Sequence, residues 1–345
     1  MASTEAKPAG PAAPVTQVVA PTSRLKAILS NQQFLLLVVW LAMVIGFTLI
    51  KPIFFSVDVA ANILLDWAPL VLIALGQLIV VISAGIDLSV GATVGFSGVI
   101  GAFAMKSLTA SGQATPTTLI AGVLVCVAVG ALVGTINALL INYARLVPFI
   151  ATLVTLGAAS GLSLVLTKGA PIMGGPTDAI MLVTPWIGPF SKPVVVIIGI
   201  VVLLWLFVHK ARFGRYTFAI GSNAFAARAA GINVKRHIAK VYVLSGVLAG
   251  LAGFFFYLRL NGGAPTSGFG MELDAIAAVV IGGAALAGGV GRVSGTVIGA
   301  LILTTVTSGL IIIGVDPSWK RVVVAVLIAI AATLQALRKT EGRAS

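Results

Sequence analysis

The chain alternates long apolar runs with short polar intervals, and this pattern predicts a series of membrane-spanning helices. A helix of about 20 residues crosses the hydrocarbon core of a bilayer, and most of the runs approach that length. The run over 274–287 is the weakest because it is short and rich in glycine. Ten spans are expected, and nine or eleven also fit the pattern. The ten are 34–50, 60–83, 88–105, 117–141, 149–167, 194–208, 238–258, 274–287, 293–313 and 319–337.

Composition supports this interpretation. Hydrophobic residues make up 59% of the 345 residues, charged residues make up 9%, and the mean hydropathy is +1.12. Soluble domains carry roughly 25% charged residues, so we expect an all-α polytopic membrane protein. Cys126 is the single cysteine and lies in an apolar run, which excludes a disulfide framework and a cysteine-based metal site.

The interval over 210–240 is the one long polar stretch between the apolar runs. Within it, Ser222 or Asn223 can cap a short helix that ends near Ala230, and Gly231 suits the left-handed position just past that end. A helix needs roughly 12–15 residues to be stable alone in water, so we expect this one to rest on another surface. An ordinary surface turn between two helices fits the spacing equally well.

The distribution of basic residues predicts the topology, because lysine and arginine favour cytoplasmic loops. With ten spans the two termini share a side, and about two thirds of the 22 lysines and arginines lie on that side. Both termini are therefore predicted to be cytoplasmic, and the net charge of +13 is a topology signal rather than a sign of nucleic-acid binding. The expected organisation is a disordered cytoplasmic tail (1–23), a transmembrane domain (24–337) with a cytoplasmic loop (210–237), and a cytoplasmic C-terminal tail (338–345).

Glycines mark two kinds of feature in the spans. Glycines three or four residues apart let helix backbones approach closely in lipid. Two other glycine-bearing segments, 83–89 and 282–291, interrupt apolar runs, and non-helical backbone at membrane depth is tolerated only inside protein or beside a watery cavity. These two breaks are candidate parts of a translocation pathway. The spaced sets are Gly95, Gly98 and Gly101; Gly130 and Gly134; Gly246 and Gly250; and Gly295 and Gly299.

The common signatures of catalysis and nucleotide binding are missing from the sequence. The dipeptide Gly-Lys does not occur, which excludes a P-loop, and there is no nucleophile elbow or HExxH motif. A carrier coupled to protons or sodium usually has an acidic residue deep in a span, whereas Asp66, Asp87, Glu272 and Asp274 lie near predicted span ends or breaks. An ion-coupled carrier and an integral-membrane enzyme are therefore less favoured hypotheses.

Several sequence blocks, taken together and in order, carry a family resemblance over roughly residues 34–337. The blocks are Gly85-Ile-Asp-Leu-Ser-Val-Gly91, Pro148-Phe-Ile-Ala-Thr-Leu153, Arg212-Phe-Gly-Arg215 leading into Ala219-Ile-Gly-Ser-Asn223, Ala226-Ala-Arg228 with Ala230-Gly-Ile232, Glu272-Leu-Asp-Ala-Ile-Ala-Ala-Val-Val-Ile-Gly-Gly283, Gly288-Gly-Val-Gly291 and Gly295-Thr-Val-Ile-Gly299. They resemble the membrane permeases of bacterial ABC importers for monosaccharides, of the ribose, xylose and arabinose type.

This resemblance implies a set of partners. The short helix looks like the coupling helix that seats in a groove of a separate ATPase subunit, and ATP and Mg²⁺ would be bound by that subunit, with no cofactor in this chain. A second permease copy (identical or paralogous), a periplasmic or extracellular sugar-binding protein and the bacterial cytoplasmic (inner) membrane are also implied. The expected coupling residues are Asn223, Phe225, Ala226, Ala227, Arg228, Gly231 and Ile232.

The translocation pathway is expected among the few polar side chains of the spans and breaks, each of which can equally well bond a neighbouring helix. Ser160 and the pair Ala284-Ala285 stand where relatives commonly carry arginine and Thr-Ser, so substrate contacts are not carried over there. A nucleoside, a branched-chain amino acid and a furanone-type signal are alternative cargoes to a monosaccharide. The residues assigned to the pathway are Gln77, Asp87, Ser89, Asn137, Glu272 and Asp274.

Overall fold

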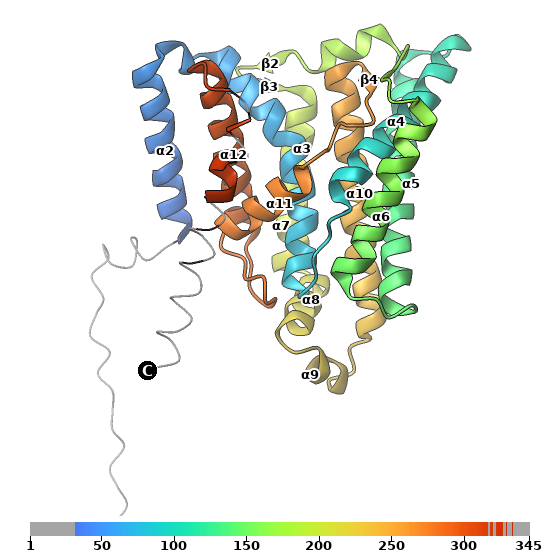
Figure 1. Cartoon of the computed structure of the whole chain (residues 1–345). Helices are drawn as coiled ribbons and strands as arrows, with labels where there is room; N and C mark the ends of the chain where they lie inside the picture. The colour runs from blue at the N-terminus through green and yellow to red at the C-terminus, as the bar shows by residue number, and fades with distance from the viewer. Residues whose placement is uncertain (1–31, 317, 320–321, 327–328, 330–332, 334–345) are drawn as a thin grey trace, which may run out of the picture.

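The computed structural model describes residues 32–316, 318–319, 322–326, 329 and 333. The predicted tails (1–23 and 338–345) and parts of the predicted span 319–337 lie outside the described residues. The described part is mostly helical (Figure 1), which confirms the prediction of an all-α polytopic membrane protein. Within it, eight helices are long and apolar enough to cross a membrane. They are α2 (Gln32–Ile50), α3 (Val57–Ile82), α4 (Val90–Ala110), α5 (Thr115–Asn142), α6 (Pro148–Thr167), α7 (Lys192–His209), α10 (Val234–Leu260) and α12 (Val293–Ile312).

The predicted span over 274–287 is only a half-length helix in the structure. Helix α11 (Met271–Ile281) has 11 residues, and at 1.5 Å per residue it is about 16 Å long, roughly half of the hydrocarbon core. Its C-cap is Gly282, and Gly283 follows with a φ of +90° that ends the helix. The backbone then stays non-helical until α12 begins at Val293, which agrees with the break predicted over 282–291.

The short elements gather at the two ends of the bundle. Helices α8 (Arg212–Ser222) and α9 (Ala224–Ala229) lie at the same end as the start of α2 (Figure 1). The opposite end carries the 3₁₀ helices η1 (Pro52–Phe54) and η2 (Thr177–Leu182) and two small antiparallel sheets. In these sheets β1 (Ile172–Met173) pairs with β4 (Gly262–Gly263), and β2 (Pro185–Ile187) pairs with β3 (Phe190–Ser191).

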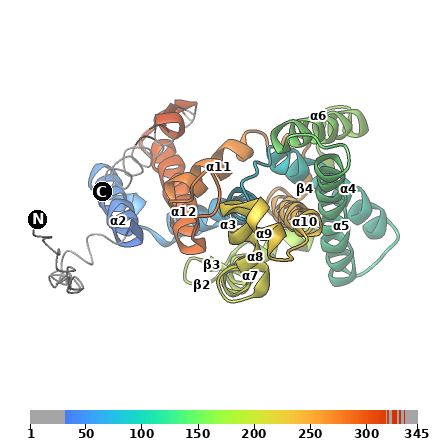
Figure 2. The same ribbon diagram turned by 90° about the horizontal axis from the view of Figure 1, so that it is seen from below.

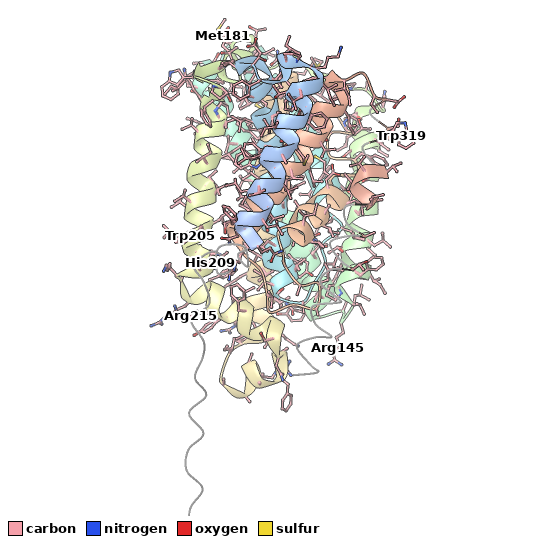
Figure 3. The ribbon with its side chains drawn as sticks, turned by 90° about the vertical axis from the view of Figure 1, so that its left-hand side faces the viewer. Arg145, Met181, Trp205, His209, Arg215 and Trp319 are labelled. Atoms are coloured by element: carbon pink, nitrogen blue, oxygen red, sulfur yellow. The ribbon has the colours of Figure 1, made fainter. Side chains whose placement is uncertain are left out.

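The labelled side chains in Figure 3 follow the same division. Arg145 and Arg215 lie at the end that carries α8 and α9, whereas Met181 and Trp319 lie toward the opposite end. Arg145 and Arg215 were predicted to share a side and do so, whereas the basic residues of the two tails lie outside the described residues. That this end faces the cytoplasm stays a prediction.

Helix α3 forms the centre of the core. Every residue from Trp67 to Ile82 is buried, including Pro69 inside the helix. A helix that is hydrophobic all round is typically buried, here by the neighbouring helices. Helix α3 contacts α10 on one flank, α11 and α12 on the other, and α7 and α8 as well. Figure 2, along the bundle from the α9 end, shows these helices surrounding it.

Most of the spaced glycines lie where helices cross. A Cβ atom on Gly130 would overlap the backbone of Gly246, and one on Gly134 would overlap the backbone at Tyr242, so α5 and α10 are in direct backbone contact. Helices α11 and α12 touch in the same way, because a Cβ atom on Gly299 would overlap the backbone of α11. Contacts this close are the packing that small residues allow in lipid.

Candidate functional site

Helix α9 is closed at both ends by the caps that the sequence predicts. At its start, Oδ1 of Asn223 accepts a hydrogen bond from the backbone N–H of Phe225 (N···O 3.0 Å). At its end, Gly231 has a φ of +83°, and the N–H of Ile232 donates to the carbonyl of Ala227 (3.1 Å). Because the free backbone groups of both ends are satisfied locally, α9 is a preformed element despite its six residues.

The outer face of α9 is open. Phe225 is 81% exposed, and Ala226 and Arg228 are exposed beside it, whereas Ala227 is only 5% exposed because α9 rests on α8 and α10. Figures 1 and 2 show α9 at the tip of the bundle. The predicted coupling residues thus fall into an exposed face, two caps (Asn223 at one end, Gly231 and Ile232 at the other) and one residue, Ala227, that faces its own chain.

The end of α8 meets both glycine-bearing breaks. The N–H of Gly289 donates to the carbonyl of Ile82 (2.8 Å), which joins the 282–291 break to the end of α3. A Cβ atom on Gly221 in α8 would overlap that same carbonyl and would lie 2.7 Å from the Gly289 nitrogen. One on Gly288 would lie 2.7 Å from the Cβ of Ala84. Three segments that are distant in sequence therefore touch through their backbones, with no long side chain between them to absorb a movement.

A buried polar network begins at the 83–89 break. Oδ1 of Asp87 accepts hydrogen bonds from the N–H and Oγ of Ser89 (2.9 and 2.6 Å), and Oδ2 accepts one from Oγ of Ser245 (2.9 Å). Nδ2 of Asn137 donates to Oγ of Ser89 (2.8 Å), and Oγ1 of Thr155 donates to Oδ1 of Asn137 (2.6 Å). All five residues are buried, so Asp87 is not an interfacial carboxylate.

The network fixes the backbone of the break. It ties the segment before α4 to α5, α6 and α10, and Oγ1 of Thr152 adds a contact to the carbonyl of Ile86 (3.3 Å). A buried carboxylate is costly unless hydrogen bonds satisfy it, and here both oxygens of Asp87 are engaged. The break is therefore a fixed part of the fold.

The remaining polar candidates have separate surroundings. Gln77 in α3 is fully buried, and neither atom of its amide has a hydrogen-bond partner among the described residues. Leaving a buried polar group unpaired costs roughly 1–3 kcal/mol, which makes Gln77 a candidate for binding water within the bundle. Two polar residues outside the predicted pathway set also have partners: Asn142 donates to the carbonyl of Lys235 in α10 (2.9 Å), and Asp66 pairs with Arg259. Both of these are contacts between elements of the fold.

Glu272 and Asp274 lie in the first turn of α11, where the helix dipole favours negative charge. The carboxylate of Glu272 packs directly on Gly91, in the first turn of α4. The six predicted pathway residues therefore occupy three places: the network around Asp87, the isolated Gln77, and this acidic turn beside the start of α4.

Comparison with known proteins decides the family. Residues 59–332 match the family model of the permease component of the branched-chain amino acid transport system. The chain belongs to this permease family. The permease is 38% identical over 311 residues to the ribose import permease protein RbsC of Escherichia coli (strain K12). The aligned region covers 89% of the permease and 94% of that relative. No solved structure matches the permease significantly.

Two further relatives agree with this. The ribose import permease protein RbsC of Bacillus subtilis (strain 168) is 40% identical over 294 residues, covering 85% of the permease and 89% of the relative. The D-allose transport system permease protein AlsC of Escherichia coli (strain K12) is 38% identical over 267 residues, with coverages of 77% and 80%. The family resemblance seen in the sequence is confirmed: the permease is a transport protein of the bacterial cytoplasmic (inner) membrane and not an enzyme.

Two members of the buried network were not predicted. Thr155 and Ser245 are hydroxyl residues within apolar spans, and many such residues in the permease bond a carbonyl one turn earlier, as Ser163 does with Ala159 (2.7 Å). No sequence signal separates the two kinds. Gly221 was part of a recognised block, but its contact with both breaks depends on tertiary structure.

Proposed function

We propose that the permease is the membrane-spanning subunit of an ABC importer that translocates a monosaccharide. The observation that carries this proposal is the similarity over 89% of the chain to a ribose import permease, supported by the allose permease and by the galactose/methyl galactoside import permease protein MglC of Escherichia coli (strain K12). A branched-chain amino acid is the second candidate cargo because the family description names it. The sugar is favoured since all three of these individual relatives are named for sugars.

ATP hydrolysis is assigned to a separate ATPase that docks on α9. Phe225 supports this assignment, since a capped helix presents its ring at 81% exposure on the tip of the bundle. Burying a phenylalanine contributes about 1.5–3 kcal/mol, enough for a central anchor in a small interface. A displacement of α9 would pass through α8 to the Gly221 contact and from there to both breaks. The end that carries α9 would face the cytoplasm.

A second permease copy, identical or paralogous, would pack on α6. Its outer face is open, and Gly157 and Gly161 have no atom of another segment within 4 Å of a Cβ position. Val154 and Val165 are exposed on the same helix. The cargo would cross between or beside the two copies, past the polar residues near the start of α4, and the bilayer would cover the remaining apolar surface.

A binding protein on the other side of the membrane would deliver the sugar. The end opposite α9 is covered by η2 and the two small sheets, which expose Met181 and Trp186. These short elements form a broad cap over the helix ends (Figure 1), and such a surface suits a soluble protein that docks and leaves.

The docking of the ATPase is tested by Phe225→Ala. The variant should retain the thermal stability of the wild type but lose the ATPase on affinity purification, and sugar uptake in cells should fall with it. Phe55→Ala is the matched control, because Phe55 is 79% exposed at the opposite end. Stoichiometric co-purification of Phe225→Ala with the ATPase, together with normal uptake, would overturn the coupling assignment.

A further inference from the structure

A cavity of about 310 Å³ opens between α4, α6 and the segment that joins β4 to α11. Ser160 of α6, Thr266 and Phe269 of the joining segment and Glu272 of α11 supply its chemistry. The joining segment descends from β4 to the start of α11, roughly midway between the two ends of the bundle (Figure 1). The volume is at the lower end of the range for small-molecule sites, about 300–1,000 Å³.

The cavity wall is built and not merely a gap under a loop. A Cβ atom on Gly91 would overlap the carboxylate of Glu272 and lie 2.5 Å from the carbonyl of Gly268, and one on Gly95 would lie 2.8 Å from the carbonyl of Pro265. The joining segment therefore lies with its backbone directly on α4. Thr266 lies between the contacts at Pro265 and Gly268 in the sequence. Close packing of this kind therefore fixes the positions of Thr266 and the neighbouring side chains.

The lining chemistry matches an uncharged polyol. The hydroxyl groups of Ser160 and Thr266 belong to residues that line the cavity, and the ring of Phe269 is 78% exposed. Hydroxyl groups of a sugar can bond to hydroxyls and to the carboxylate of Glu272, while the C–H face of a sugar ring can pack on an aromatic ring. Among the described residues that line the cavity, Glu272 is the one charged group, so an anionic cargo or the carboxylate of an amino acid would meet repulsion.

The position of Glu272 supports a functional role. Ionisable residues at membrane depth are rare and usually face a bundle interior or a watery cavity on a transport route. We infer that this cavity is a contact site for a monosaccharide during translocation, formed by Ser160, Thr266, Phe269 and Glu272. The inference rests on the proposed importer function, and it adds the residues that touch the cargo within the permease itself.

The test uses the complete importer, reconstituted in proteoliposomes with its ATPase and binding protein. Uptake of radiolabelled D-ribose, D-allose and D-galactose is measured beside ATP hydrolysis for Thr266→Val and Phe269→Leu. Thr135→Val and Phe103→Leu are matched controls in α5 and α4; the Thr135 hydroxyl bonds within its own helix. Each test variant should lower uptake of the transported sugar about tenfold, while ATP hydrolysis stays within about twofold of the wild type and both controls behave as the wild type.

Other outcomes separate the two levels of the argument. If the wild type imports a sugar and both test variants import it equally well, the contact site is wrong and the importer function stands. If uptake and hydrolysis fall together, the residues support the fold rather than the cargo, and the contact site is again wrong. If the wild-type importer takes up none of the three sugars, the proposed cargo fails and this inference fails with it.

Discussion

The crossing of α5 and α10 and the outer face of α6 carry glycines at the same spacing but use them differently. At the crossing, each of Gly130, Gly134, Gly246 and Gly250 lies so close to the facing helix that a Cβ atom would overlap its backbone. On α6, Gly157 and Gly161 are also four residues apart, yet nothing from another segment lies within 4 Å of their Cβ positions. The glycines of α5 and α10 pack on each other within the chain, whereas those on the outer face of α6 have no packing partner within the described residues.

The difference shows that a four-residue spacing of glycines indicates that another helix can approach closely, but it does not indicate which helix does so. Helices in lipid associate through packing, because lipid chains are as apolar as the side chains they would replace. A helix gains little by keeping small residues on a face that meets only lipid. The bare glycines of α6 therefore support an interface with another chain, whereas those of α5 and α10 hold this chain together.

The largest effect is expected at the closed crossing. Gly246→Leu would place a side chain against the backbone of Gly130, which has no rotamer with which to move aside. Overpacking of a core costs about 1–3 kcal/mol and sometimes more, and here we expect at least the upper value, with loss of folded protein in size-exclusion chromatography. Gly199→Leu in α7, where a Cβ atom meets nothing within 4 Å, should fold normally. A monodisperse Gly246→Leu permease with an unchanged melting temperature would show that the crossing is not close-packed in solution.

The next effect is on assembly and not on folding. Gly161→Leu in α6 should leave the melting temperature within about 2 °C of the wild type, since nothing in the same chain contacts that position. It should halve the mass of the detergent-solubilised permease measured by light scattering, because the added side chain would keep the two copies of the proposed pair apart. A mass equal to that of the wild type would assign the face of α6 to lipid and leave the glycine pair without a partner.

These two predictions also mark what the sequence can supply. The eight long helices, the two breaks and both caps of α9 could be predicted because each depends on local chemistry: an apolar run, an interrupted run, Asn223 before the helix and Gly231 after it. The half length of α11 was not predicted, because the apolar residues before and after the turn at Gly282 and Gly283 resemble one continuous apolar run. The joining of distant segments, as at Ile82 and Gly289, follows from tertiary packing that no local pattern contains.

A glycine of a third kind lies at the contact of α8 with the breaks. Gly221 packs on backbone, as the crossing glycines do, but the helix that carries it ends next to the exposed α9. Gly221→Ala should push α8 away from Ile82 and Gly289, so that ATP hydrolysis in the reconstituted importer continues while sugar uptake falls about fivefold or more. Gly199→Ala is the control for a harmless added methyl group. Uptake and hydrolysis that remain in the wild-type ratio would exclude this contact as the route of coupling.

The smallest effect is expected at the charged part of the exposed face of α9. Arg228 lies one helical turn from Phe225, and an exposed ion pair contributes only about 0–1 kcal/mol. Arg228→Glu should therefore weaken ATPase binding by about fivefold at low salt, and the difference from the wild type should shrink at high salt because exposed charges are screened.

Arg145→Glu, an equal change of charge at the same end of the bundle (Figure 3), separates a local contact from a general effect of net charge. Titration of the ATPase onto immobilised permease at several salt concentrations measures both variants. Equal weakening by both variants would mean that the ATPase responds to the net charge of this end of the bundle and not to Arg228 itself. A loss that salt leaves unchanged would place Arg228 in a desolvated contact beside Phe225, which resembles the close-packed crossing of α5 and α10 more than an exposed face.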